Sequence, residues 1–212
     1  MGSTAAIVVA AGGGTRFGAP KQFAHLDGTR LVDRAVAVAS AACDTVILVL
    51  PAAHRWDGPP VAAVVAGGAT RADSVRAGLA AVPVGADIVV VHDAARPLAT
   101  KALFTAVVAA VRDGADAAVP GVALADTVKR VEDDRVVETL PRAQLVAVQT
   151  PQAFRAAALG AAHAGGADAT DDAALVETAG GTVVVVPGDP ANLKVTTTGD
   201  LAVAATLLGE GR

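Results

Sequence analysis

The chain has 212 residues, a formal net charge of −4, one cysteine, one tryptophan, four phenylalanines and no tyrosine. A negative charge and few aromatic rings argue against a nucleic-acid-binding surface, which needs a basic field and stacking side chains. The single cysteine, Cys43, excludes an internal disulfide and a cysteine-rich metal site, and we expect it to be a small buried residue at a helix end.

The length suits one domain spanning residues 1–212. No apolar run has the length of a membrane span, and the start of the chain lacks the basic and apolar segments of a signal peptide. We therefore expect a cytoplasmic protein with neither a membrane nor a nucleic-acid partner.

The first half alternates apolar strand-like runs with helical patterns, which is typical of parallel βαβ units. The expected strands are 5–9, 45–50, 61–65, 87–91 and 115–120. Helices are expected to begin at Thr29, Thr70 and Thr100, because a threonine side chain can cap the first turn. The pattern predicts an α/β fold, Rossmann-like, with a mostly parallel sheet and helices on both faces.

The pattern changes after residue 120. Residues 127–131 and 135–139 alternate apolar with polar side chains around a turn of acidic residues, which predicts a hairpin. We expect residues 123–142 to form a β-arm that packs on a second copy of the chain; folding back onto its own domain is the alternative. Later helices are expected at 154–163, 171–178 and 200–208, and a strand at 182–186.

A glycine-rich loop, residues 10–21, follows the first strand. Three consecutive glycines remove every Cβ from the turn, so backbone N–H groups can approach a ligand, while Arg16 and Lys21 add two cations. Neither a P-loop nor a dinucleotide fingerprint fits, because residues 19–21 read Ala-Pro-Lys and Phe17 stands where a small residue is needed. A polyphosphate site is the functional interpretation, and a flexible surface loop is the alternative.

Two further polar segments, 67–74 and 92–97, also follow expected strands. In an open parallel sheet, ligands bind beyond the carboxyl ends of the strands, so these segments should meet the glycine loop in one crevice. Together they suit a nucleoside triphosphate with Mg²⁺, held mainly by the phosphates near Asp93. Taken singly, Asp93 could cap a turn, His92 could be a core histidine, and Arg71 with Asp73 could be an exposed pair.

These segments resemble the 2-C-methyl-D-erythritol 4-phosphate cytidylyltransferase family. The matching stretches run in the family's order along nearly the whole chain: 10–21, 67–74, 91–97, 126–129, 149–154, 170–172 and 192–196. The resemblance implies a Rossmann-like homodimer whose β-arm reaches into the partner's site. It also implies a non-mevalonate isoprenoid enzyme that joins CTP and methylerythritol phosphate, releasing pyrophosphate.

The resemblance also assigns roles to individual residues. It implies that Arg16 and Lys21 stabilise the transition state, and that Arg142 and Lys194 position the sugar phosphate. The residues implied at the CTP site are Ala10, Ala11, Gly12, Gly14, Gly68, Ser74 and Asp93. Those implied to help bind the sugar phosphate are Arg96, Thr127 and Thr170, with Thr127 and Arg142 coming from the partner's arm. Two departures from the family are Ala69, where an acid is common, and Gly13, where a larger residue is common.

The expected chemistry is in-line attack by a phosphate monoester, which is already anionic near neutral pH and so needs no strong base. Catalysis would then be positioning and charge neutralisation by cations. The alternatives are a ribitol-5-phosphate cytidylyltransferase, a non-catalytic nucleotide-binding regulator, and, third, a Rossmann oxidoreductase.

Overall fold

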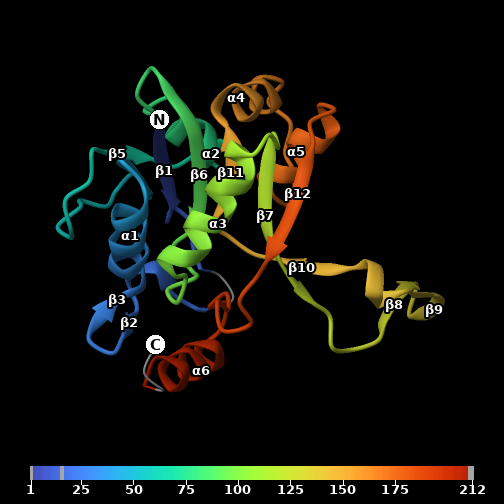
Figure 1. The fold of residues 1–212 in the computed structure, drawn as a ribbon. Coiled ribbons are helices and arrows are strands. Elements are labelled where there is room, and N and C mark those ends of the chain that lie inside the picture. The colour runs from blue at the N-terminus through green and yellow to red at the C-terminus, as the bar shows by residue number, and fades with distance from the viewer. Residues whose placement is uncertain (1, 15–16, 210–212) are drawn as a thin grey trace.

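The computed structural model describes residues 2–14 and 17–209. Within them, eight strands form one twisted sheet in the order β10-β7-β11-β6-β1-β4-β5, with β12 also paired to β7 (Figure 1). The strands of this sheet are β1 (Ser3–Val9), β4 (Thr45–Leu50), β5 (Ala63–Ala66), β6 (Ala86–Asp93), β7 (Ala117–Ala123), β10 (Val146–Val148), β11 (Gln152–Arg155) and β12 (Val183–Pro187). The pairs among β6, β1, β4 and β5 are parallel, as predicted.

Helices cover both faces of the sheet, because its central strands are apolar on both sides. One core layer packs α1 (Leu31–Ala42) and α3 (Lys101–Arg112) on the sheet, with Phe104 fully buried. The other packs α2 (Arg71–Leu79), α4 (Ala156–Ala164) and α5 (Asp172–Thr178). The closing helix, α6 (Thr198–Gly209), packs with Leu26 and Leu31 in a third cluster.

Two of the three threonine caps are confirmed. Thr70 caps α2 and Thr100 caps α3, each accepting a hydrogen bond from the backbone three residues on. The prediction for Thr29 is wrong: it lies in β3 (Thr29–Arg30), which pairs with β2 (His25–Leu26), and α1 begins after Arg30 without a side-chain cap. Cys43 does end α1, half-buried, and burial raises its pKa to about 12.

The helix predicted over 154–163 starts two residues too early. Phe154 and Arg155 belong to β11, which inserts antiparallel between β6 and β7, and α4 begins only at Ala156. Phe154 is fully buried, so tertiary packing overrides the helical pattern here. The short strand β10, also antiparallel to β7, was not predicted.

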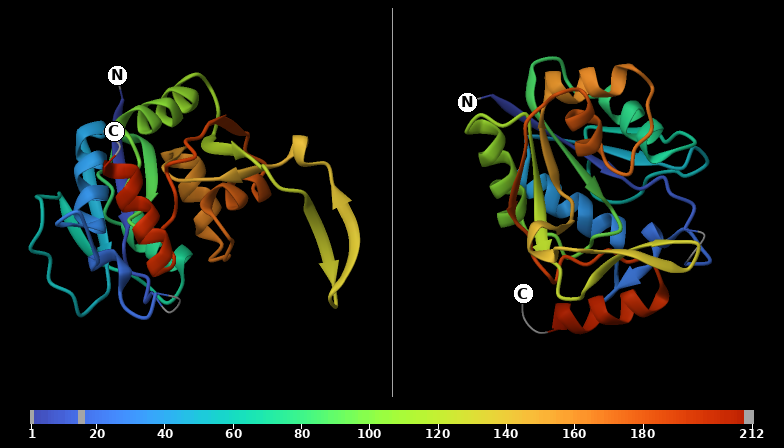
Figure 2. Two further views of the ribbon diagram at one scale, coloured as in Figure 1. Left: turned by 90° about the horizontal axis from the view of Figure 1, so that it is seen from below. Right: turned by 90° about the vertical axis from the view of Figure 1, so that its right-hand side faces the viewer.

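The predicted hairpin is confirmed as β8 (Val128–Glu132) and β9 (Arg135–Leu140), a separate two-stranded sheet. It projects from the end of the main sheet as a long curved arm (Figure 2, left). The 3₁₀ turn η2 (Arg142–Gln144) leads from the arm back into β10. The arm does not fold back onto the sheet, so that alternative is wrong.

Candidate active site

The predicted convergence at the strand ends is confirmed. Backbone hydrogen bonds join the segment after each strand to its neighbour: Ala10 to Val49 at 2.8 Å, Gly67 to Leu50 at 2.8 Å, and Ala94 to Val9 at 3.0 Å. Three segments far apart in the sequence therefore line one edge of the sheet. This edge is where ligands bind in open parallel sheets.

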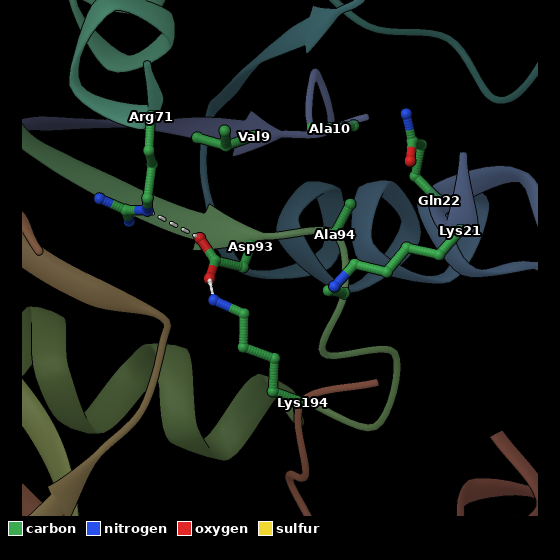
Figure 3. A pocket seen from close by; sticks show the side chains of 10 residues that line it. Val9, Ala10, Lys21, Gln22, Arg71, Asp93, Ala94 and Lys194 are labelled. Carbon is green, nitrogen blue, oxygen red and sulfur yellow. Dashed lines mark hydrogen bonds and ion pairs between the residues drawn. The ribbon is translucent and has the colours of Figure 1, made fainter. Parts of the chain in front are cut away.

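The glycine loop is a tight turn. Gly14 has a φ of +66°, and its carbonyl oxygen accepts hydrogen bonds from the backbone of Phe17 and Gly18. A Cβ at Gly14 would lie 2.0 Å from the carbonyl oxygen of Ala19, so only glycine fits. The loop then enters the turn η1 (Lys21–Phe23), whose Lys21 extends its ammonium group toward Ala94 (Figure 3).

The second glycine segment is fixed by the cap of α2. Thr70 and Asp73 form a reciprocal capping box, and the Ser74 hydroxyl accepts a hydrogen bond from Gly68 at 3.2 Å and donates to the Thr70 carbonyl at 3.0 Å. A Cβ at Gly67 would lie 2.2 Å from that of Ala11, so this turn packs directly against the glycine loop. The side chain of Ser74 thus holds the turn at Gly68 in place through hydrogen bonds to its backbone.

Asp93 is the centre of the site. It ends β6, and each of its two carboxylate oxygens meets one cation: Oδ1 lies 3.2 Å from Arg71 Nε and Oδ2 lies 2.6 Å from Lys194 Nζ (Figure 3). Burial alone would raise the pKa of Asp93, but the charges of Arg71 and Lys194 outweigh it and hold the pKa well below its usual range. Asp93 is therefore ionised near neutral pH.

Two adjoining cavities, each of about 180 Å³, meet at this ion-paired group. The first is lined by residues of the glycine loop, including Ala10, Gly12 and Lys21. The second is lined by Arg96 and Thr170, among others. Arg71, Asp93 and Lys194 line both, so they form the boundary between the cavities.

Several predicted residues do not line either cavity. Ala11, Gly14, Gly68 and Ser74 belong to the two turns that support the first cavity. Thr127 and Arg142 lie exposed at the base of the arm, where the Arg142 guanidinium donates a hydrogen bond to the carbonyl of Ala125. Arg16 lies outside the described residues.

The sequence analysis missed Arg71 as a site residue. Arg71 pairs with Asp93 and, at 2.7 Å, with Asp172. Asp73 pairs with Arg76 instead, so the exposed pair of Arg71 with Asp73 considered from the sequence is wrong. Burial would lower the pKa of Arg71, but the two carboxylates outweigh it and raise the pKa. Gln22, also missed, is buried and lines the first cavity, and its Nε2 has no hydrogen-bond partner among the described residues.

His92 and Arg96 are close neighbours of Asp93 in the chain, and each has its own hydrogen-bond partners. His92 is fully buried, with Nδ1 at 3.1 Å from the Thr150 hydroxyl, which also accepts a hydrogen bond from the Asp93 amide. Burial lowers the pKa of His92 to about 4. His92 is thus a neutral core residue, but its Nε2 has no hydrogen-bond partner among the described residues, so the alternative of a satisfied core histidine is met at Nδ1 only. Arg96 donates to the carbonyl of Asn192 at 2.8 Å, and burial lowers its pKa.

Magnesium can be tested against these side chains. Across residues 2–14 and 17–209, no three His, Cys, Asp or Glu side chains gather as a metal-binding group. Mg²⁺ usually takes one or two carboxylates and completes its shell with phosphate oxygens and water. Asp93 lines both cavities, but Arg71 and Lys194 already pair with its two oxygens, so this carboxylate suits a neighbour of a metal that is held mainly by phosphate oxygens. None of the helices in the described part of the chain is long and apolar enough to cross a bilayer.

Comparisons with known proteins agree on one family. The family model described as 2-C-methyl-D-erythritol 4-phosphate cytidylyltransferase matches residues 4–210. A protein of that name from Nocardia farcinica is 48% identical, with 98% of this chain and 94% of the relative covered. A protein of the same name from Streptomyces avermitilis is 45% identical, with 99% of this chain and 93% of the relative covered. The crystal structure of the Thermus thermophilus protein of that name superposes with a TM-score of 0.83 at 33% identity, covering 98% of each chain.

Proposed function

Because the chain belongs to the 2-C-methyl-D-erythritol 4-phosphate cytidylyltransferase family, we propose that its two cavities divide the two substrates between them. The protein is a nucleotidyltransferase of isoprenoid biosynthesis that joins CTP and methylerythritol phosphate. In the proposal, the first cavity holds the triphosphate of CTP and the second holds the sugar phosphate. The observation that carries this division is the group of Arg71, Asp93 and Lys194, which lines both cavities.

The proposed reaction is an in-line displacement at the α-phosphorus. An oxygen of the methylerythritol phosphate attacks, the bond to the bridging oxygen breaks, and pyrophosphate leaves with the electron pair. The phosphate monoester is already anionic, so Lys194 and Arg96 need only hold it, while Lys21 and Arg16 neutralise charge that develops on the α-phosphate. Main-chain N–H groups of the glycine loop add donors that need no reorganisation.

Mg²⁺ is part of this proposal. When bound, it would neutralise charge on the leaving pyrophosphate, with Asp93 as the carboxylate beside it. Removing magnesium with a chelator is expected to abolish turnover, and adding magnesium back is expected to restore it.

The arm is proposed to join two copies of the chain. It is two-stranded, too small to have its own core, and it leaves Val131, Val136 and Val137 exposed. Thr127 and Arg142 line neither cavity of their own chain, which supports a role for them at the site of a second copy. The proposed homodimer places each arm over the partner's second cavity.

Mixed dimers test this exchange. Lys21→Ala removes a core group and Arg142→Ala removes an arm group, so a dimer of one variant with the other contains one intact site. The assay uses methylerythritol phosphate well below the raised KM of Arg142→Ala, so that each variant alone turns over little. Mixing the variants after exchange of subunits should then restore about a quarter of the wild-type sites, because half of the dimers are mixed. If each arm served its own chain, mixing would restore nothing.

The decisive assay for the function is pyrophosphate release from CTP, run in parallel with methylerythritol phosphate and with ribitol 5-phosphate. We expect turnover with the first and little with the second. Preference for ribitol phosphate would replace the substrate, and CTP binding without pyrophosphate release would indicate a regulator. The single domain and the cytoplasmic location stay predictions, the latter checked by fractionating cells.

A further inference from the structure

A second carboxylate, Asp172, lies behind the site and lines neither cavity. It occupies the first turn of α5 and is 1% exposed, and both of its oxygens are engaged. Oδ2 lies 2.7 Å from Arg71 Nη1, and Oδ1 lies 3.0 Å from Nε2 of His163, which is 3% exposed in α4. Four side chains thus connect α4 to the cavity boundary in the order His163, Asp172, Arg71 and Asp93.

This arrangement decides how Arg71 meets Asp93. A guanidinium facing one carboxylate tends to form two parallel hydrogen bonds with it. Here Asp172 binds Nη1 and so fixes the orientation of the guanidinium, and Arg71 reaches Asp93 through Nε alone, at 3.2 Å. Nη2, the donor that lies beside Nε, has no hydrogen-bond partner among the described residues. The second oxygen of Asp93 remains available to Lys194, which binds it at 2.6 Å. The position of the Lys194 ammonium group therefore depends on Asp172, although the two side chains do not touch.

Asp172 also helps to hold the connection between α4 and α5 in place. His163 lies near the end of α4 and Asp172 at the start of α5, so their contact spans the connection 165–171. That connection carries Thr170, which lines the second cavity. Arg76 also holds it, by donating to the carbonyl of Ala167 at 3.1 Å. The contact between His163 and Asp172 thus holds both ends of the segment that carries this part of the cavity wall.

We propose that Asp172, held by His163, is a positioning residue that acts through Arg71 on Asp93 and Lys194 and through the loop that carries Thr170. This inference rests on the proposed assignment of the second cavity to the sugar phosphate. Because Lys194 and Thr170, the two groups expected to move, are both assigned to the sugar phosphate, the effect should fall on methylerythritol phosphate more than on CTP.

The test is Asp172→Asn in the full chain, which keeps size and shape but removes the charge that holds Arg71 Nη1 and orients the guanidinium. We expect kcat/KM for methylerythritol phosphate to fall about 10- to 100-fold, since a displacement near 1 Å can cost that much. The KM for CTP should change less than about twofold. The matched control is Glu177→Gln, the same acid-to-amide change on the exposed side of α5, which should behave as wild type.

His163 supplies the second arm of the test. His163→Gln keeps a hydrogen-bond donor and should retain most of the activity, whereas His163→Leu should reproduce the selective loss. The His163 variants also decide the matter if Asp172→Asn does not fold. Unchanged kinetics in Asp172→Asn, or an equal loss for both substrates that follows the folded fraction, would overturn the inference.

Crystal structures of Asp172→Asn and His163→Leu give a readout that does not depend on turnover. We expect Arg71 to turn Nε and Nη2 together toward Asp93, and Lys194 to move. If Lys194 keeps its place, the inference fails even for an active enzyme. If wild type does not turn over methylerythritol phosphate but Lys194 moves in the variants, the proposed function fails and the positioning role stands.

Discussion

Lowering the pH should unfold the protein partly through one buried side chain, His92. The ring is fully buried under Asp93 and tilts against Phe104, with ring centroids 5.2 Å apart. The Thr150 hydroxyl accepts the Asp93 amide proton and so has its own hydrogen left for His92 Nδ1. Protonating Nδ1 would remove that acceptor and place a charge in the core.

The sign and size follow from the two pKa values of His92. Burial lowers the pKa from 6.5 to about 4 in the folded protein, so the unfolded chain binds more protons between these values. The stability is fully present above about pH 6.5 and falls as the pH falls toward 4. The difference corresponds to about 3 kcal/mol in all, of which about 2 kcal/mol is lost between pH 7 and pH 5.

The assay is urea unfolding at pH 7 and pH 5 for wild type and for His92→Asn, whose amide can still accept from Thr150. The quantity compared is the change in the free energy of unfolding with pH and not its value at pH 7, so the carboxylates common to both proteins cancel. We expect the variant to lose about 2 kcal/mol less than wild type on acidification. His25→Asn, at an exposed histidine, should lose as much as wild type. An identical loss in wild type and His92→Asn would refute the reasoning.

Four substitutions test the rest of the molecule. Lys21→Ala is expected to lower kcat by about 10²–10³-fold in the pyrophosphate-release assay, by analogy with loss of an oxyanion donor, and unchanged kcat would remove its transition-state role. Arg142→Ala should mainly raise the KM for methylerythritol phosphate in the same assay, so a loss confined to kcat would contradict a positioning role. Thr70→Ala breaks the capping box of α2 and should lower the free energy of urea unfolding by about 1 kcal/mol; no change would mean that the cap is redundant. Phe104→Ala empties a fully buried position and should cost about 3–5 kcal/mol in the same measurement, unless the core between α1 and α3 collapses into the space.

Local signals in the sequence were enough for much of the fold. Thr70 and Thr100 predict the starts of their helices, because a capping side chain and the backbone group that it binds are only three residues apart. The alternating pattern of the arm likewise sets which residues pair across its turn. The prediction fails at Thr29 and Phe154, where pairing with another strand overrides the local preference.

By itself, the sequence determined the βαβ alternation of the first half, the glycine loop and the strand ends that meet at the site, since parallel βαβ units bring carboxyl ends to one edge. Only the tertiary structure decided which charges pair there. Arg71 meets carboxylates 22 and 101 residues away, and Lys194 meets Asp93 across 101 residues, distances over which no spacing rule operates. Ion pairing depends on where packed helices bring side-chain ends together, and that is set by the whole core at once.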